Sequence, residues 1–206
     1  MVHDAIFVVH ERRQSMGMDV MGKNPTSTKG EYFRNNIWWW HPLWNFCSAV
    51  APEICDKVEH AHSNDGDGLD ELDSVELSKR LFTALKDGTA KQYIKERNDY
   101  IKSLPKRKCS HCMATGMRLW YKNTKTGETR NSYEYDMMAD ILGDGQKLPK
   151  YKKSPIKKDE TEISDTCNGC GGKGETEPNG ANYFIDEKNI REFANFLKAC
   201  GGFQIF

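Results

Sequence analysis

The stretch Cys109-Ser-His-Cys112 and its counterpart Cys167-Asn-Gly-Cys170 decide how this chain folds. Two residues between cysteines let both thiolates reach one ion from a tight turn, and two such turns supply the four sulfurs that structural zinc prefers. The odd total of seven cysteines and the lack of a secretory signal favour a reducing compartment over two disulfides. We therefore predict a closed, structural Zn²⁺ site. Its ligands are Cys109, Cys112, Cys167 and Cys170.

Glycines follow both cysteine pairs. Residues 167–174 have the pattern Cys-x-x-Cys-x-Gly-x-Gly, whereas residues 109–116 keep Gly116 but carry Ala114 at the middle glycine. These half-motifs resemble the zinc modules of DnaJ-type co-chaperones, in which two of them close one site at the end of a β-hairpin. The chain has one pair of half-motifs and no His-Pro-Asp signature of a J-domain. The resemblance therefore implies local metal geometry and not co-chaperone activity.

The segments around the zinc motif predict an α+β fold. Apolar spacing predicts helices over 73–88 and 89–104, paired as an antiparallel hairpin, a strand over 117–121 and a short helix over 133–142. A C-terminal helix with a short terminal strand follows. We expect a mainly helical, aromatic-rich part (1–105), a four-cysteine zinc-ribbon or hairpin module with a lysine-rich insertion (106–180), and a C-terminal helix and strand packing back on the core (181–206).

Four of the five tryptophans lie within residues 38–44, in a segment that we predict to be helical from Tyr32. Such an aromatic stripe usually belongs to a core. Three consecutive tryptophans nevertheless fan around a helix, so at least one of them should be exposed. Tryptophan and arginine dominate interface energetics, which leaves partner binding open beside burial. The partner-binding candidates are Arg34, Trp38, Trp39 and Trp40.

The charges balance overall but are segregated along the chain. Thirty Lys and Arg face thirty Asp and Glu, which excludes a globally basic nucleic-acid binder. Acids concentrate in residues 59–76 and lysines in 147–158. The lysine segment is either a solvated linker or a phosphate-contacting loop. In the second case the nucleic-acid contacts would be Lys150, Lys152, Lys153, Lys157 and Lys158.

A polar segment offers candidates for an enzyme or a small-ligand site. His60, His62 and Asp65 could hold a metal or a ligand together with Arg34, although Asn-Asp-Gly sequences are also ordinary turns. The sequence has no nucleophile elbow, phosphate loop or His-Glu-x-x-His motif. The pattern therefore favours a non-enzymatic protein and leaves the enzyme hypothesis open.

A wider resemblance rests on several motifs together. They are Glu31 to Trp44, Asn64-Asp-Gly66, the cysteine half-motifs, Asn189 to Phe193 and Gly201 to Ile205. The chain resembles a family of uncharacterised bacteriophage and bacterial proteins. That resemblance implies action in the cytoplasm of a host cell and carries no established activity. No apolar run approaches the ~18 residues of a membrane span. We expect a zinc protein that binds a macromolecular partner, foremost a host protein, with nucleic acid as the alternative.

Overall fold

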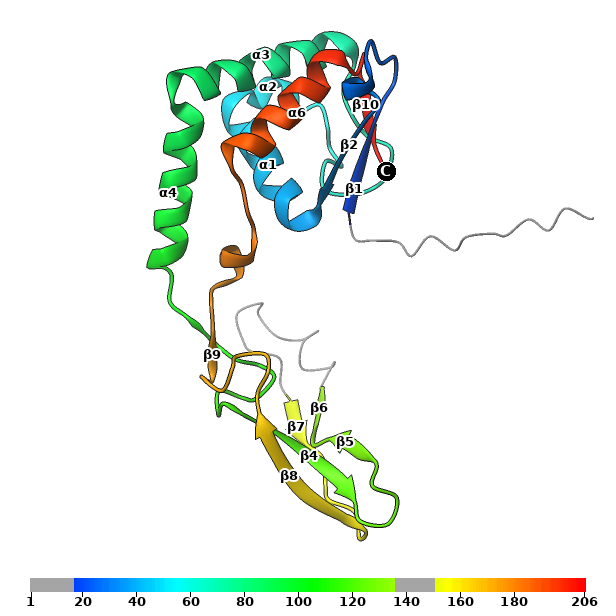
Figure 1. Ribbon diagram of the computed structural model, residues 1–206, viewed down its shortest axis with the longest axis vertical. Helices are drawn as coiled ribbons and strands as arrows, with labels where there is room; N and C mark the ends of the chain where they lie inside the picture. The colour runs from blue at the N-terminus through cyan, green and yellow to red at the C-terminus, as the bar shows by residue number, and fades with distance from the viewer. Residues whose placement is uncertain (1–16, 136–150) are drawn as a thin grey trace, which may run out of the picture. The chain divides into compact units, whose positions relative to one another are not determined.

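The computed structural model describes residues 17–135 and 151–206. These residues divide into two compact units, each followed along the chain in Figure 1. The first unit comprises residues 17–103 together with Asn179–Phe206, and the second is Leu104–Pro178. All described α-helices belong to the first unit, and the second unit is built from strands and turns in its described part. The mixed α+β class expected from the sequence is confirmed.

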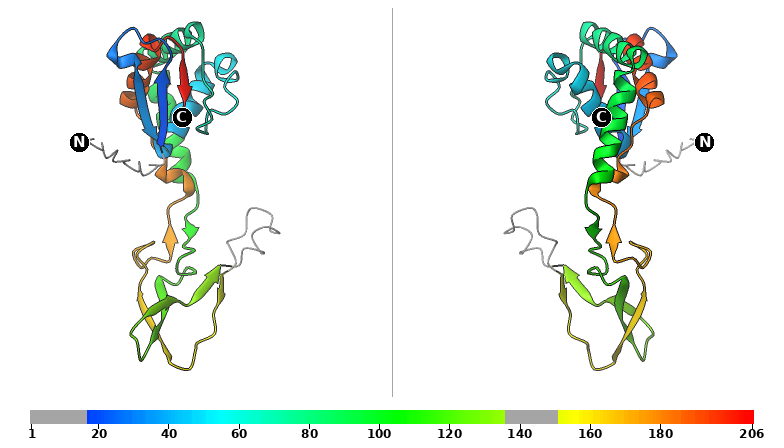
Figure 2. Two further views of the ribbon diagram at one scale, coloured as in Figure 1. Left: turned by 90° about the vertical axis from the view of Figure 1, so that its right-hand side faces the viewer. Right: turned by 90° about the vertical axis from the view of Figure 1, so that its left-hand side faces the viewer.

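Beside its helices, the first unit contains a small antiparallel sheet, of which the sequence predicted only the C-terminal strand. Its strands are β1 (Gly17–Gly22), β2 (Tyr32–Asn36) and β10 (Phe203–Ile205), in the order β10-β1-β2. Val20 lies opposite both Phe33 and Ile205, and helices lie behind the sheet in Figure 2. The prediction of a helix from Tyr32 was wrong for residues 32–36. Their backbone pairs with β1 instead, and their side chains alternate between exposed and half-buried positions as in a strand.

The helices of the first unit begin and end at recognisable signals. They are α1 (Ile37–Val50), α2 (Pro52–Cys55), α3 (Glu71–Asp87), α4 (Thr89–Ser103) and α6 (Glu187–Ala199). The Asp70 carboxylate caps α3 by accepting from the Asp73 N–H, three residues before the predicted capping box. Gly88 ends α3 in the left-handed conformation, as predicted. No helix in the described ranges could cross a membrane.

Helix α6 takes the place beside α3 that the sequence assigned to α4. Figure 1 shows α6 lying along α3, whereas α4 turns away from α3 instead of folding back on it. The Ser78 hydroxyl donates to the Ala194 carbonyl (2.7 Å), so small residues bring α3 and α6 together. The predicted hairpin was therefore wrong in geometry. Most of α4 stays exposed, with Ala90 its only buried residue.

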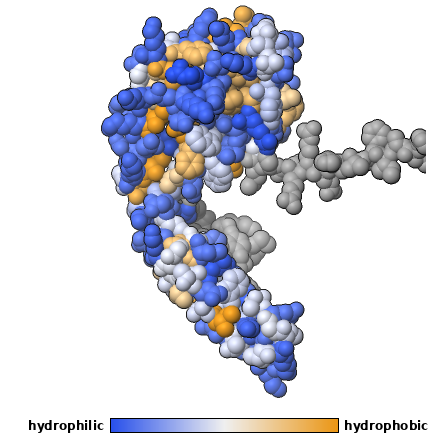
Figure 3. Space-filling view, viewed as in Figure 1, coloured by the Kyte–Doolittle hydropathy of each residue, from blue (hydrophilic) through white to orange (hydrophobic). Residues whose placement is uncertain are grey.

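The core of the first unit is formed by both ends of its sequence. Helix α6 and strand β10 pack against α1, α3 and β1, and the predicted apolar stripe of α6 is fully buried. The large buried side chains of this core include Trp40, Leu43, Phe46, Leu77, Leu81, Ile190, Phe193, Leu197, Phe203 and Ile205. On the face seen in Figure 3, apolar patches interrupt a largely hydrophilic surface.

The second unit consists of short antiparallel ladders. Strand β4 (Met117–Asn123) pairs with β8 (Glu160–Thr166) and β5 (Thr129–Asn131), and β3 (Arg107–Lys108) pairs with β9 (Glu175–Thr176). The strand predicted over 117–121 is confirmed. Strand β6 (Tyr133–Tyr135) pairs with β7 (Tyr151–Lys153). A helix at Tyr133 was therefore wrong at its start, and the rest of that prediction lies outside the described residues.

Candidate metal centre

The four predicted cysteines meet at one point of the second unit. Their sulfur atoms all lie within 4.8 Å of one another, and all four residues are buried. Cys109 Sγ is 3.9 Å from Cys167 Sγ, and Cys112 Sγ is 3.7 Å from Cys170 Sγ. Four sulfurs placed tetrahedrally at the usual Zn–S distance of about 2.3 Å would be about 3.8 Å apart. The cluster therefore has the dimensions of a tetrahedral thiolate site that could hold a metal ion.

The backbone holds the two cysteine pairs in nearly the same way. The Gly116 N–H donates to Cys112 Sγ (3.3 Å), and the Gly174 N–H donates to Cys170 Sγ (3.2 Å). Each half also bonds to the other, since Cys109 N donates to the Gly174 carbonyl (2.8 Å) and Cys167 N donates to the Gly116 carbonyl (2.9 Å). Amides directed at sulfur stabilise thiolates. The backbone thus favours the negatively charged thiolate form of Cys112 and Cys170, which is the form that binds a metal.

The turn after each cysteine pair needs left-handed backbone. Gly171 and Gly172 have φ of 57° and 80° in one half, and the equivalent Met113 and Ala114 have φ of 53° and 65° in the other. This conformation is unstrained for glycine and costs free energy for other residues. Ala114, where the half-motif departs from its pattern, therefore adopts the glycine conformation without being glycine.

The thiols differ in acidity. Burial raises the pKa of Cys109 to about 12. Burial also acts to raise the pKa of Cys170, but the Gly174 N–H and the neighbouring thiols outweigh it and lower that pKa to about 7. The hydrogen bonds therefore favour the thiolate more at Cys170 than at Cys109, and a bound metal would displace the protons of the cysteines that are still protonated. The donor set fits a soft or borderline divalent metal.

His111 lies beside the cluster and is not one of its ligands. The group of potential metal ligands in the described part of the chain contains the four cysteines without His111. Its imidazole instead packs over the other cysteine turn, where a Cβ on Gly169 would come 2.7 Å from His111 Cδ2. Gly169 is thus required for close contact between the two turns. A metal ion bound by all four thiolates would have no open coordination position for a substrate.

The three consecutive tryptophans have different surroundings. Trp40 is fully buried and its Nε1–H donates to the Ala61 carbonyl (2.7 Å), which removes it from any partner-binding surface. Trp38 is 39% exposed, and Trp39 is half-buried. Their rings contact Tyr183 and Phe184 respectively, at centroid distances of 4.9 and 5.6 Å. We call Trp38, Trp39, Tyr183 and Phe184 the aromatic surface.

Pro42 explains how Tyr183 and Phe184 reach the tryptophans. Proline has no N–H to donate to the carbonyl four residues earlier, so Pro42 inside α1 leaves the Trp38 carbonyl without its helical partner. That carbonyl accepts from the Phe184 N–H instead (2.8 Å). Sequence reasoning missed Tyr183 and Phe184. Pro42, four residues after Trp38, was the available signal that the Trp38 carbonyl lacks a helical donor. It could not indicate which N–H from elsewhere in the chain would donate to that carbonyl.

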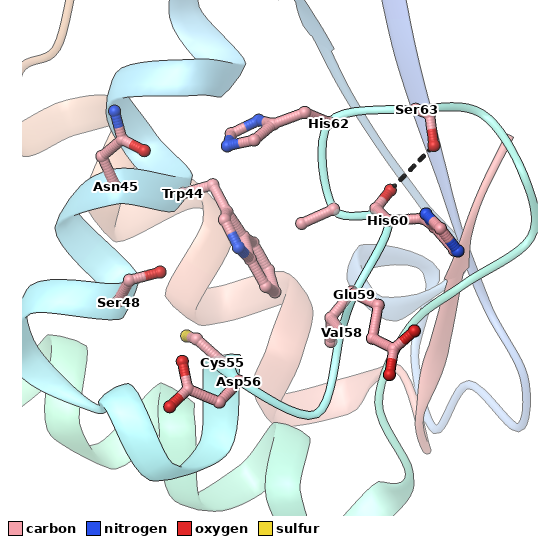
Figure 4. Close-up of a pocket in the computed structure, with 11 residues that line it drawn as sticks. Trp44, Asn45, Ser48, Cys55, Asp56, Val58, Glu59, His60, His62 and Ser63 are labelled. Atoms are coloured by element: carbon pink, nitrogen blue, oxygen red, sulfur yellow. Dashed lines mark hydrogen bonds between the residues drawn. The ribbon is translucent and has the colours of Figure 1, made fainter.

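The polar segment at residues 60–65 does not assemble the predicted ligand site. His60 and His62 both line a 590 Å³ cavity, but Figure 4 shows their rings pointing in different directions. The Asp65 carboxylate accepts from the Ser63 hydroxyl, and Arg34 lines a different cavity. His62 contacts His41 of α1 instead (ring centroids 4.4 Å apart). The two histidine rings therefore do not converge, and neither Arg34 nor Asp65 is among the residues that line their cavity.

The predicted lysines belong to the second unit, whereas Trp38, Trp39 and Trp40 belong to the first; Trp120 of β4 is in the second unit. Lys153 pairs with Glu162 (2.6 Å) on the second unit, and Lys157 and Lys158 are exposed there. Lys152 belongs to strand β7, which corrects the expectation of an open loop at that point. Lys150 lies outside the described residues. Within the part of the chain that the structure describes, no single unit presents both the lysines and the aromatic surface.

Comparisons with known proteins add no family to this geometry. The chain has no match among protein-family models, curated proteins or solved structures.

Proposed function

We propose that this protein is a zinc protein that acts by binding a macromolecular partner through its first unit. The carrying observation is the aromatic surface, where Trp38 is 39% and Phe184 48% exposed although the same unit buries Trp40 completely. Exposed aromatic rings next to an arginine are the composition that dominates protein interfaces. Arg34 lies on β2, three residues before the start of α1, and lines the same cavity as Trp39.

We assign zinc to the four-cysteine cluster, with a structural role. The sulfur spacing supports this choice over a catalytic metal, and so does the composition of the cluster, which contains only the four cysteines among the described residues. Elemental analysis of the purified protein should give one zinc per chain. Cys112→Ser should abolish it, and Cys200→Ser, a buried cysteine outside the cluster, should not. A protein whose second unit is folded in the absence of zinc would refute the assignment.

The resemblance to bacteriophage proteins that the sequence motifs suggest, if it reflects the origin of the chain, makes a protein of the bacterial host cytoplasm the expected partner. Tagged protein would be incubated with bacterial lysate and bound proteins quantified. Wild type and Tyr100→Ala, an exposed aromatic on α4, should retain one stoichiometric partner, and Trp38→Ala/Phe184→Ala should lose it. Equal capture by all three proteins, or no stoichiometric capture, would reject the aromatic surface as the binding site.

A further inference from the structure

A groove runs between β2 and the first turns of α6. Strand β2 is the outer strand of its sheet in the described residues, since β1 pairs with it on one side only. Beside it lies a cavity of about 480 Å³. The lining residues are Arg34, Asn35, Asn36, Trp39, Asp186, Lys188, Asn189 and Glu192. We call this cavity the Asn189 groove. Trp39 belongs both to this groove and to the aromatic surface.

Asn189 has a hydrogen-bond donor with no partner. The residue is only 6% exposed, and its Oδ1 accepts from Asn35 Nδ2 (3.0 Å). Its own Nδ2 is buried and makes no hydrogen bond with any described residue. Native proteins leave few buried polar groups unsatisfied, and those that occur call for a physical reason. The donor is covered in the free protein, but Asn189 lines the groove, so an acceptor from outside would reach the donor after a small side-chain movement.

The charges of the groove favour an uncharged acceptor. Lys188 lies 3.9 Å from Glu192, Asp186 accepts from the Asn189 backbone N–H (2.7 Å), and Arg34 lies 3.4 Å from Asp19. The charged residues that line the groove are two cations and two anions, so its lining carries no net formal charge to attract an ion. A peptide carbonyl or a carboxamide oxygen is neutral and accepts from an N–H.

We propose that the Asn189 groove binds an extended peptide segment of the partner, with one of its carbonyl oxygens accepting from Asn189 Nδ2. This inference rests on the proposed function, because it specifies how the protein partner is held. Addition of an extended peptide beside an outer strand is a common recognition mode. The ring of Trp39 provides an apolar wall for a peptide side chain beside the carbonyl.

The experiment uses a library of linear 12-residue peptides selected on the full-length, zinc-loaded protein. Selected peptides would be synthesised and titrated into ¹⁵N-labelled wild-type protein. The side-chain NH₂ signals of Asn189 should shift on binding, together with backbone amides of β2. Asn189→Asp keeps the acceptor for Asn35 but replaces the orphan donor with a second acceptor, so peptide affinity should fall about tenfold or more. Asn45→Asp, the same change on an exposed residue of α1, should bind like wild type.

The wild-type titration keeps the proposal testable if Asn189→Asp fails to fold. Selection of no peptide, or of peptides that leave the Asn189 signals unchanged, would overturn the inference. Peptides that shift Trp38 and Tyr183 signals but not those of Asn189 would also overturn it. That last outcome would leave the aromatic surface as the partner site, so the two proposals fail separately.

Discussion

At the scale of single residues, Ala114 marks a strained point in the metal centre. Its φ of 65° matches that of the glycines in the other cysteine turn, and a left-handed residue with a Cβ costs roughly 1–2 kcal/mol. Ala114→Gly should therefore raise the free energy of unfolding of the zinc-loaded second unit by about 1 kcal/mol, reduced by the greater freedom of glycine in the unfolded chain. Denaturant titration followed through β4 amide signals would measure the change.

Gly174→Ala is the matched opposite change in the same centre. A Cβ there would lie 2.4 Å from the Ala114 carbonyl oxygen, at a φ of 74°, so this variant should lose stability by more than Ala114→Gly gains. If Ala114→Gly lowers the free energy of unfolding instead, the contacts of the Ala114 methyl group stabilise the unit by more than its left-handed backbone destabilises it.

Burial of His41 and His62, whose rings contact each other, should make the first unit less stable in acid. Burial lowers the pKa of His41, and burial followed by the charge of His41 lowers the pKa of His62. The unfolded chain then binds more protons than the folded one below the usual histidine pKa of about 6.5. The stability from the neutral pair is thus present above that pH and is lost as the pH falls through the lowered values.

Unfolding of the first unit at pH 7.5 and pH 5.5 would measure this effect. His62→Gln should reduce the stability difference between the two pH values, and the His41→Gln/His62→Gln double variant should reduce it further. An identical pH dependence in all three proteins would mean that the acid sensitivity arises elsewhere.

At the scale of elements, Pro42 links α1 to the segment before α6. Pro42→Ala restores an N–H that can bond to the Trp38 carbonyl, which now accepts from the Phe184 N–H (2.8 Å). We expect the helix to take back that carbonyl and the Phe184 amide to lose its protection. Hydrogen exchange at Phe184 should accelerate at least tenfold in the variant, while exchange in α3 stays unchanged. Unchanged protection at Phe184 would show that its ring contact with Trp39 suffices to hold the segment.

Elements governed by local signals were predictable, and those governed by distant partners were not. The stripe of α6 and the stop at Gly88 follow from spacing and from glycine conformation, and both are confirmed. The segment from Tyr32 to Asn36 looks helical beside the tryptophans, but β1 and Phe193 of α6 determine its strand conformation. The cysteine cluster was predictable because ligand chemistry, not local propensity, joins residues 58 positions apart.

At the scale of the whole molecule, the two units depend on different sources of stability. The first has a continuous core of aromatic and aliphatic side chains contributed by α1, α3, α6 and the sheet. In the second, the buried hydrophobic cluster of the described residues consists of the four cysteines alone. Small domains without an adequate apolar core usually need a metal or disulfides. Only 37% of the chain is hydrophobic, and this shortage of apolar side chains therefore matters most for the stability of the second unit.

Removal of the metal should consequently unfold one unit and spare the other. With a strong zinc chelator, or in Cys109→Ser, the β4 and β8 amide signals should collapse to unfolded positions, because metal binding supplies the folding free energy of such a site. The near-ultraviolet dichroism of the buried Trp40 and Trp44 (5.6 Å between ring centroids) should persist, since both belong to the first unit. Cys200→Ser controls for loss of a thiol outside the cluster. Loss of both signals together would mean that the units fold as one, and survival of the β4 signals without metal would mean that the thiols alone stabilise the cluster.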